Sequence, residues 1–471
     1  MTDNSMIPVD INETIVAIAT PPGMGGIGVV RLSGPAALRI VSELFQAKDG
    51  TRPKEWPSHT VHYGHVIDTR NREAAVVDEV LVSVMRSPRS YTREDVVEIS
   101  CHGGLAVLRW VLELAVAHGA RLAEPGEFTR RAFLNGRIDL TQAEAVLDTV
   151  QATHESFLRV SSRQMKGELT AELESLREDL MTVYTQLEAG VNFPDEDTDS
   201  LSSQERQNFL DAVRRRVEDL IQSGDQGRLL KDGITIVICG RPNVGKSSLL
   251  NVLLREPRAI VSPLPGTTRD TVEEWAQIGG LPFRLVDTAG ILEPRDVVEE
   301  EAVRRSRLNI EQADLVLFML DQSQVLSDED RKLVGQIEGR QLVVVVNKCD
   351  LEARMSPDEA RSLFPGSEVL WISVLQRRNL EQLRQTMVDT VLEGRPLESG
   401  RLLVSNLRHI EALRRAAAFL NAALGSLKGD LSAEFVSEDI RKAVDELDRI
   451  TGRQADQDLL DRIFAAFCIG K

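Results

Sequence analysis

Residues 240–248 read Gly-Arg-Pro-Asn-Val-Gly-Lys-Ser-Ser and decide the fold of the middle of the chain. This G-x-x-x-x-G-K-S loop directly follows a largely apolar run at 234–238 and precedes a helical pattern at 248–254. In such an arrangement, backbone N–H groups surround the phosphates of a nucleotide and the lysine, Lys246, adds a positive charge. A hydroxyl after the lysine, here Ser247, ligates Mg²⁺. The loop predicts a nucleoside-triphosphate site on an α/β sheet.

A second motif follows at the expected distance. Residues 283–290 read Phe-Arg-Leu-Val-Asp-Thr-Ala-Gly, a strand pattern that ends in D-x-x-G. This motif places Asp287 near the Mg²⁺ ion and the N–H of Gly290 near the γ-phosphate.

The third motif indicates which base is bound. Residues 342–350 read Leu-Val-Val-Val-Val-Asn-Lys-Cys-Asp, an apolar strand that runs into N-K-x-D. The carboxylate of Asp350 can accept hydrogen bonds from N1 and N2 of guanine, a donor pair that adenine lacks. Asn347 and Lys348 line the same pocket. Three motifs in this order and spacing predict a GTPase.

The residue after D-x-x-G does not supply a water-positioning group. Ras-type GTPases have a glutamine there, which orients the attacking water; this chain has Ile291. An aliphatic side chain cannot hydrogen-bond to water, so another group must do so. The acidic run 296–301 is a candidate source, and its alternative interpretation is the solvent-exposed beginning of a helix.

Asn243 suggests how charge on the phosphates is offset. No arginine is obviously placed as an internal finger, whereas position four of the phosphate loop lies beside the β–γ bridging oxygen. A monovalent cation held by Asn243 and by carbonyls of the segment 259–270 would occupy the place of an arginine finger. Thr268, in the same segment, would close on Mg²⁺.

Composition bounds the remaining possibilities. The chain has 471 residues and a formal net charge of −17, which argues against bulk electrostatic binding of nucleic acid. Its four cysteines form no C-x-x-C pair and its seven histidines show no metal-ligand spacing, so neither a zinc site nor a disulfide framework is indicated. No window reaches the ~18 apolar residues of a membrane span, and the amino end carries acid instead of base and no long apolar core. We expect a cytoplasmic protein without a membrane segment.

The periodicity of apolar residues changes along the chain and predicts a multidomain protein. Short β-type runs and a helix at 105–117 predict an α+β domain over 1–125. Apolar residues spaced by three and four from 169 to 187 predict a long helix, and a second helix is expected at about 203–223, with Gly224 and Gly227 marking entry to the next domain. The predicted order is an α+β domain (1–125), the first part of an all-α domain (126–228), an inserted P-loop α/β (Ras-like) GTPase domain (229–392) and the second helical part (393–471).

Several motifs together resemble the MnmE (TrmE) family of tRNA modification GTPases. The phosphate loop, the hydrophobic residue after Asp-Thr-Ala-Gly and the terminal Phe-Cys-Ile-Gly-Lys carry the likeness, and it spans the whole chain. Further matching stretches are 20–31, 101–104, 125–129, 131–140, 192–196 and 266–270. The loop 373–379, Ser-Val-Leu-Gln-Arg-Arg-Asn, departs from the Ser-Ala and glycine-rich step that often closes over guanine.

The resemblance implies a folate-dependent activity on tRNA. It implies that the amino-terminal domain forms a homodimer and binds a one-carbon tetrahydrofolate, either the 5-formyl or the 5,10-methylene form, at Arg31, Glu98, Arg137 and Lys471. It also implies a heterotetramer with a flavoprotein, MnmG (GidA), that installs a carboxymethylaminomethyl or aminomethyl group at C5 of the wobble uridine of certain tRNAs. Cys468 is a candidate catalytic thiol, with a buried anchor of the terminus as the alternative.

The same resemblance assigns residues to each part of the GTPase site. Glu299 would activate water and Lys246 would act as the catalytic cation. The Mg²⁺ ligands would be Ser247 and Thr268, and the K⁺ ligands would be Asn243, Ser262, Leu264 and Thr267. The GTP contacts would be Asn243, Val244, Gly245, Lys246, Ser247, Ser248, Ser262, Pro263, Leu264, Pro265, Gly266, Thr267, Thr268, Asp287, Thr288, Ala289, Gly290, Asn347, Lys348, Asp350, Ser373 and Val374.

Two alternative functions are also compatible with the GTPase motifs. A ribosome-assembly or translation GTPase would need an RNA-binding module or basic patch, and none is visible in the sequence. A stand-alone folate-dependent one-carbon transferase with a regulatory GTPase is the third hypothesis.

Overall fold

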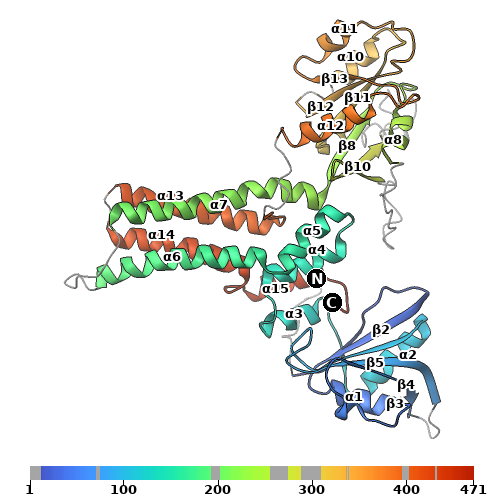
Figure 1. The fold of residues 1–471 in the computed structure, drawn as a ribbon, viewed down its shortest axis with the longest axis vertical. Helices are drawn as coiled ribbons and strands as arrows, with labels where there is room; N and C mark the ends of the chain where they lie inside the picture. Colours follow the sequence, from blue (N-terminus) through green and yellow to red (C-terminus); the bar gives the residue numbers. More distant parts are fainter. Residues whose placement is uncertain are drawn as a thin grey trace, which may run out of the picture. The chain divides into compact units, whose positions relative to one another are not determined.

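The computed structural model describes residues 12–70, 75–192, 202–254, 274–287, 309–335, 337, 339–394, 402–429 and 432–471. The chain divides into two compact units (Figure 1). The first contains Met1–Val150, Gln164–Glu178 and Val444–Lys471, and the second contains Gln151–Arg163 and Asp179–Ala443.

The first unit is built on a seven-stranded sheet in the order β3-β4-β5-β6-β2-β1-β7. Its elements in chain order are β1 (Ile15–Ile18), β2 (Gly25–Ser33), α1 (Ala37–Leu44), β3 (Phe45–Ala47), β4 (Thr60–Asp68), β5 (Ala75–Met85), β6 (Val96–Gly103), α2 (Leu105–Ala117) and β7 (Arg121–Leu122). The sequence predicted α2 with these bounds, whereas β4 and α1 were not predicted.

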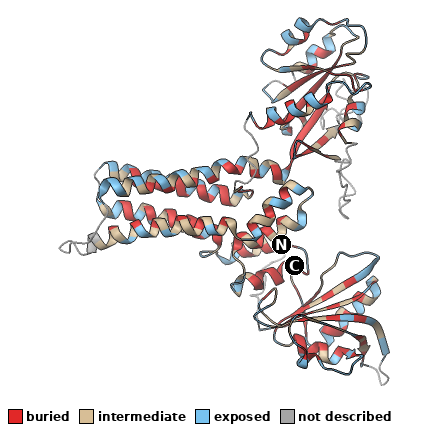
Figure 2. Ribbon diagram, in the orientation of Figure 1, coloured by how far each residue is buried: buried red, intermediate tan, exposed pale blue. Residues whose placement is uncertain are grey.

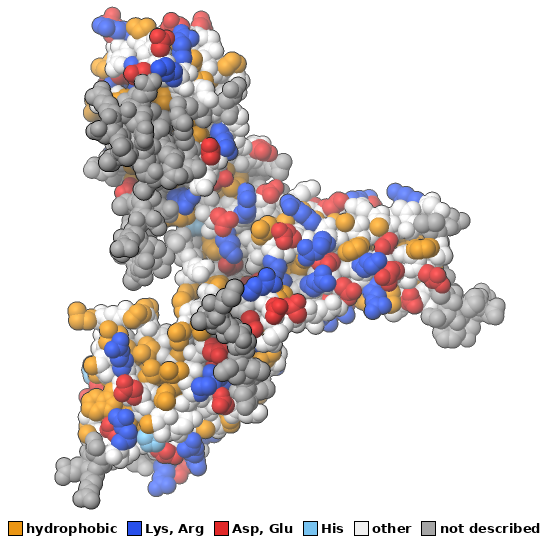
Figure 3. Space-filling model, turned by 180° about the vertical axis from the view of Figure 1, so that it is seen from behind, with side chains coloured by type: hydrophobic (Ala, Val, Ile, Leu, Met, Phe, Trp, Pro, Cys, Tyr) orange, Lys and Arg blue, Asp and Glu red, His pale blue; other side chains and the backbone are white. Residues whose placement is uncertain are grey.

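Side chains alternate across this sheet, as strand geometry requires. Val30, Val82 and Ile99 are buried in one cluster with apolar residues of α1 and α2. On the opposite face, Arg31 of β2 is the register partner of Glu98 of β6. Apolar side chains are also exposed on this domain, among them Ile27, Val61, Tyr63 and Leu81, and Figure 3 shows hydrophobic side chains gathered over its surface.

Helices α3 (Glu127–Leu134), α4 (Leu140–Gln151) and α15 (Gln457–Ala465) complete the first unit. Leu140 and Ala143 of α4 share a buried cluster with Leu460 and Phe464 of α15. Residues more than 300 positions apart therefore form one core. Helices α6 (Glu168–Asn192) and α14 (Ala433–Thr451) are each divided between the two units.

In the second unit, α7 (Ser203–Asp232) packs along α13 (Leu407–Lys428). Figure 2 shows the buried stripes of these helices. The sequence-based prediction that the helix ends before Gly224 was wrong, because α7 continues through Gly224 and Gly227 to Asp232. Both glycines lie at close contacts: a Cβ on Gly227 would be 2.3 Å from the carbonyl oxygen of Val404, and one on Gly224 would be 2.7 Å from Ile410.

The six-stranded sheet of the second unit has the order β13-β12-β11-β8-β10-β9. All strand pairs are parallel except β9 with β10. The elements are β8 (Ile234–Cys239), α8 (Lys246–Leu254), β9 (Glu274–Ile278), β10 (Leu281–Asp287), β11 (Leu315–Asp321), α10 (Asp328–Val334), β12 (Leu342–Asn347), α11 (Pro357–Leu363), β13 (Glu368–Trp371) and α12 (Leu380–Val391).

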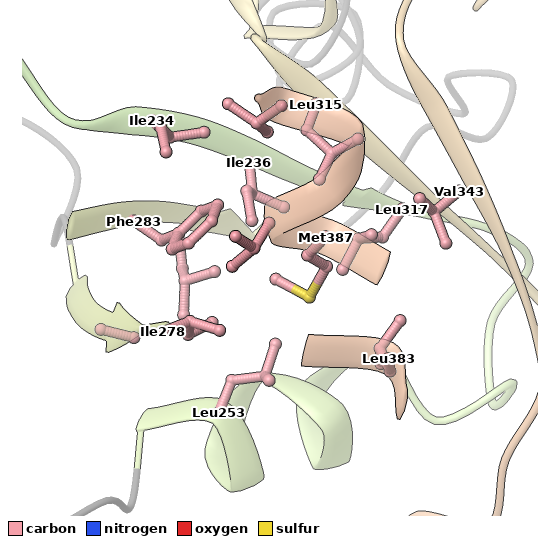
Figure 4. Packing of buried hydrophobic residues seen from close by; sticks show 14 of the residues in the cluster. Ile234, Ile236, Leu253, Ile278, Phe283, Leu315, Leu317, Val343, Leu383 and Met387 are labelled. Carbon is pink, nitrogen blue, oxygen red and sulfur yellow. The ribbon is translucent and has the colours of Figure 1, made fainter. Parts of the chain in front are cut away.

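Both faces of this sheet are covered, which is why its strands are continuous apolar runs. Ile234, Ile236 and Ile238 of β8 belong to one buried cluster, and the alternating Val237 and Cys239 belong to another. Figure 4 shows the first cluster, in which side chains from the strands, α8 and α12 meet. The carboxyl ends of the parallel strands, where such sheets bind ligands, are thereby fixed in place.

Helix α5 (Glu155–Met165) contributes to the same core. The side chain of Phe157 is only 3% exposed and belongs to the buried cluster that contains Leu230 at the end of α7 and Ile234 at the start of β8. The core of the nucleotide-binding sheet therefore includes a residue from a helix 77 positions before β8.

Candidate functional site

The phosphate loop begins where β8 ends. Gly240 has φ 141°, and a Cβ there would lie 2.4 Å from the carbonyl oxygen of Met319 on β11, so only glycine fits without displacement. Lys246 opens α8, and its Nζ donates to the carbonyl oxygens of Gly240 (2.8 Å) and Arg241 (2.9 Å). The loop is thus closed on itself, with the ammonium group held over it. The Nε of Arg241 also pairs with the buried carboxylate of Asp330 at 2.8 Å.

A pocket of about 520 Å³ lies beside this loop. It brings together residues from the phosphate loop, the N-K-x-D motif and the 373–379 loop. Its lining residues are Asn243, Gly245, Ser248, Asn251, Val252, Asn347, Lys348, Asp350, Leu351, Ser373, Val374, Leu375 and Arg377.

Asn347 joins the three segments of the pocket. Its Nδ2 donates to the carbonyl oxygen of Val244 at 2.8 Å, and its Oδ1 accepts from the N–H of Val374 at 3.1 Å. The residue is 4% exposed. A Cβ on Gly245 would lie 2.3 Å from the same Nδ2, so the loop must carry glycine there. Asn347 therefore fixes the position of the phosphate loop relative to the 373–379 loop.

Lys348 is fixed by an acidic residue on the neighbouring strand. Its Nζ lies 2.6 Å from Oδ2 of Asp321 at the end of β11, and its φ is 62°. Burial raises the pKa of Asp321, but hydrogen bonds from Lys348 and Ser323 outweigh that effect and lower the pKa below its usual value. Asp321 is therefore ionised at neutral pH, which keeps the ion pair with Lys348 intact. Asp350 is the carboxylate that lines the pocket.

Part of the predicted GTPase site lies outside the described residues. Asp287 ends β10 beside Ile238 of β8, which places its backbone at the same sheet edge as the phosphate loop. The predicted residues outside the described ranges are Ser262, Pro263, Leu264, Pro265, Gly266, Thr267, Thr268, Thr288, Ala289, Gly290 and Glu299.

A second polar site lies on the open sheet face of the first unit. Nε and Nη2 of Arg31 each lie 2.8 Å from Oε1 of Glu98, and Nη1 of Arg31 donates to the carbonyl oxygen of Gly470 at 3.0 Å. The guanidinium also lies 5.9 Å from the centre of the Tyr91 ring and 5.6 Å from that of Phe128. Within the described parts of the chain, Oε2 of Glu98 accepts no hydrogen bond.

Arg137 also lies over the ring of Tyr91. Its guanidinium carbon is 4.7 Å from the ring centre of Tyr91, and its Nη1 donates to the carbonyl oxygen of Tyr91 at 3.0 Å. The hydroxyl of Tyr91 contacts Oγ1 of Thr129 at 2.9 Å. Three of the four predicted folate residues, Arg31, Glu98 and Arg137, are therefore connected through Tyr91.

The segment 468–471 reaches this site through a tight backbone contact. Gly470 has φ 94°, and a Cβ there would lie 2.6 Å from the carbonyl oxygen of Ile18 on β1. Cys468 accepts at its carbonyl from the N–H of Gly126 (3.4 Å), and its side chain is exposed. Lys471 is half-buried beside it. By contrast, burial raises the pKa of the Cys101 thiol to about 12.

Sequence reasoning missed several residues that the structure brings into the two sites. Leu351, Leu375 and Arg377 line the nucleotide pocket, and Tyr91 and Phe128 flank Arg31. Leu351 directly follows N-K-x-D and could have been inferred from the motif. Nothing local in the sequence marks Tyr91.

Neither a metal-ligand cluster nor a membrane-spanning helix occurs among the described residues. They contain no cluster of three or more His, Cys, Asp or Glu side chains that could hold a metal ion. None of the helices in the described ranges is long and apolar enough to cross a bilayer.

The sheet, the phosphate loop and the guanine-side pocket define a P-loop GTPase that carries helical and α+β domains. The MnmE helical domain model matches residues 140–468, and the model for the GTP-binding protein TrmE N-terminus matches residues 14–137. The chain belongs to the MnmE family of tRNA modification GTPases. It is therefore a GTP-hydrolysing enzyme of tRNA modification.

Relatives agree with this assignment over nearly the whole chain. The tRNA modification GTPase MnmE of Geobacillus kaustophilus is 44% identical over 461 residues, which cover 98% of this chain and 99% of the relative. That of Bacillus subtilis is 43% identical over 98% of this chain and 100% of its own length. A crystal structure of Aquifex aeolicus Era bound to GDP.AlF4- is 31% identical and covers 39% of this chain and 66% of its own, at a TM-score of 0.28.

Proposed function

We propose that this GTPase acts with a flavoprotein partner, MnmG (GidA), to install a carboxymethylaminomethyl or aminomethyl group at C5 of the wobble uridine of certain tRNAs. A one-carbon tetrahydrofolate, in the 5-formyl or 5,10-methylene form, supplies the carbon. The chain works in the cytoplasm as a homodimer, within a heterotetramer with the flavoprotein. The exposed apolar residues Ile27, Val61 and Leu81 support a protein partner for this domain.

One observation carries the folate part of the proposal: Arg31 links Glu98 to the backbone of Gly470. A pterin ring presents a pair of N–H donors, and a carboxylate with a free oxygen is the matching acceptor. Oε2 of Glu98 is such an oxygen within the described residues, and Arg31 orients the carboxylate through Oε1. Arg137 would receive the carboxylate of the glutamate tail, and Tyr91 offers an aromatic face between them.

Cys468 and Lys471 would complete this site from the tail that Gly470 anchors. The exposed Cys468 thiol would be the reactive group, and Lys471 would add a cation near the folate. When bound, the folate supplies the one-carbon unit. The residues described here bind it, orient it and place a thiol beside it.

The nucleotide site would use K⁺ and Mg²⁺. Asn243 lines the pocket with φ 66°, a conformation that asparagine adopts more readily than most residues, and its amide oxygen suits a hard cation. Ser262, Leu264 and Thr267 would be the other K⁺ ligands, while Ser247 and Thr268 would ligate Mg²⁺. Glu299 would activate water and Lys246 would stabilise phosphate charge. Dimerisation of the GTPase domains would complete the active site.

Analysis of wobble nucleosides tests the whole proposal. A deletion strain should lack the modified uridine, and a plasmid copy of the gene should restore it. Glu98→Gln should fail to restore it, because a neutral amide cannot replace the carboxylate acceptor. Arg39→Gln is the matched control, since Arg39 is an exposed arginine of the same domain that pairs with Glu43 on α1. An unchanged nucleoside profile in the deletion strain would remove the proposed function.

A further inference from the structure

Another arginine, Arg93, lies next to the proposed folate site and has no role in it so far. Arg93 is exposed, and its Nη1 donates to the carbonyl oxygen of Asn135 at 2.8 Å. The same Nη1 would lie 3.5 Å from a Cβ built on Gly136. Arg93 therefore lies over the turn that carries Arg137.

Hydrogen bonds hold this turn against the 91–93 segment. Arg137 donates to the carbonyl oxygen of Tyr91 at 3.0 Å, and Asn135 donates to that of Thr92 at 2.6 Å. The N–H of Arg137 also bonds to the carbonyl oxygen of Ala132 at 2.9 Å. The two guanidiniums are thus presented from one firmly connected piece of backbone.

Both guanidiniums lack an acidic partner in the described parts of the chain, where they bond only to carbonyl oxygens. Three other arginines of this domain are paired with carboxylates: Arg31 with Glu98, Arg121 with Glu127, and Arg131 with Glu94. Two neighbouring cations without carboxylates favour the binding of an anion, since an arginine fork matches a carboxylate with two parallel hydrogen bonds.

We propose that Arg93, together with Arg137, binds the carboxylates of an oligo-γ-glutamyl tail on the folate. The inference rests on the proposed folate site. Arg137 would take the first glutamate, and Arg93, which bonds to the carbonyl oxygen of Asn135 in the same turn, would take the next. The substrate of this chain is then a folate that carries several γ-linked glutamates.

An RNA phosphate backbone is the less favoured occupant. Phosphate binding draws its affinity from many neutralised charges, whereas this turn presents the guanidiniums of Arg93 and Arg137 on a chain with a net charge of −17. Arg137 of this pair also lies against the Tyr91 ring that Arg31 contacts, an arrangement that a folate tail would follow and a separate RNA contact would not require.

Direct binding measurements test the inference. The full chain is titrated with 5-formyltetrahydrofolate that bears one or three γ-linked glutamates. The wild-type chain should bind the triglutamate about 10-fold more tightly, the size expected of one added charge-assisted hydrogen bond. Arg93→Gln should reduce this ratio to about one. Arg93→Lys, which keeps the charge but loses the fork, should give an intermediate ratio, and the control Arg39→Gln should keep the full ratio.

The outcomes separate the inference from the proposed function. Equal wild-type affinity for the two tails overturns the inference and leaves the folate site standing, whereas no binding of either folate overturns the folate site itself. An Arg93→Gln chain that keeps the tail preference, whether or not its affinity for tRNA falls, also overturns the inference. A loss of affinity for both tails in equal proportion does the same, because it would assign Arg93 to the structure of the site.

Discussion

The side-chain amide of Asn347 donates a 2.8 Å hydrogen bond to the carbonyl oxygen of Val244, across 103 positions of sequence. The same amide accepts from Val374, so one buried residue holds both walls of the nucleotide pocket. Asn347 therefore has a structural role in the pocket, in addition to any contact that it makes with the base.

Asn347→Ala should weaken GTP and GDP binding by about 10- to 100-fold. The substitution leaves a buried acceptor and a buried donor without partners, and each such loss costs about 1–3 kcal/mol, part of which falls on the bound state. Fluorescent-nucleotide titration measures the effect. Asn208→Ala, at an exposed position of α7, is the control, and an Asn347→Ala affinity equal to that of the control would contradict the assigned role.

Hydrolysis should be faster in potassium than in sodium buffer if Asn243 helps to hold a monovalent cation. Loss of one charge-stabilising group typically costs about 10²–10³ in rate, so Asn243→Ala should bring the potassium-to-sodium ratio close to one. Phosphate release at saturating GTP is the measurement. Equal wild-type rates in the two buffers would refute the cation site.

Phe157→Ala should destabilise the second unit by about 3–5 kcal/mol, because it opens a cavity in the core shared with Leu230 and Ile234. Thermal unfolding detects the change. The neighbouring Leu158 is 41% exposed, so Leu158→Ala should have a much smaller effect. Similar losses for the two variants would show that α5 does not belong to this core.

Acidification should weaken the contact between His154, the residue before α5, and α5, because Nδ1 of His154 accepts a hydrogen bond from the N–H of Phe157. Burial lowers the pKa of His154 to about 4 from an ordinary value of 6.5. Since the unfolded chain binds this proton more readily, the contribution is fully present above pH 6.5 and is lost as the pH falls towards 4. Between pH 7 and pH 5, the melting temperature of His154→Gln should therefore fall less than that of the wild type. Identical losses would contradict the prediction.

Thiol reagents should distinguish the cysteines. Cys468 is exposed, whereas Cys101 and Cys239 are buried and burial raises the pKa of each to about 12. At pH 8, iodoacetamide should label Cys468 readily and the two buried thiols very little, which peptide mass spectrometry can measure. Cys468→Ser identifies the fast site. Rapid labelling of Cys101 in the native chain would show that the sheet core is open.

The described part of the nucleotide pocket could be predicted from sequence because its chemistry is local. Gly240 and Gly245 have φ values of 141° and 107°, and their contacts leave no room for a Cβ, so the backbone itself requires the motif. A fixed backbone near phosphates can be recognised from consecutive residues. The connection of Asn347 to Val374 could not be recognised in this way, because it depends on how two strands lie side by side.

The folate-side cluster shows the opposite case. Arg31 and Glu98 were named through resemblance, but Tyr91 and Phe128 are placed by pairings across the sheet and by α3. The sequence does not predict the continuation of α7 through Gly224 and Gly227, because glycine disfavours the interior of a helix. Because these two glycines have no side chain, α13 and the segment before it can approach α7 closely.

Arg31 and Gly470 are separated by 439 positions, yet they form one hydrogen bond. During synthesis, the sheet that carries Arg31 can leave the ribosome and fold hundreds of residues before its tail partner exists. The site is therefore the last part of its own domain to be assembled, and a nascent chain can hold a finished sheet and a finished nucleotide pocket without a complete folate-side cluster. Any ligand that needs Gly470 in place can distinguish a chain synthesised through Gly470 from every shorter precursor.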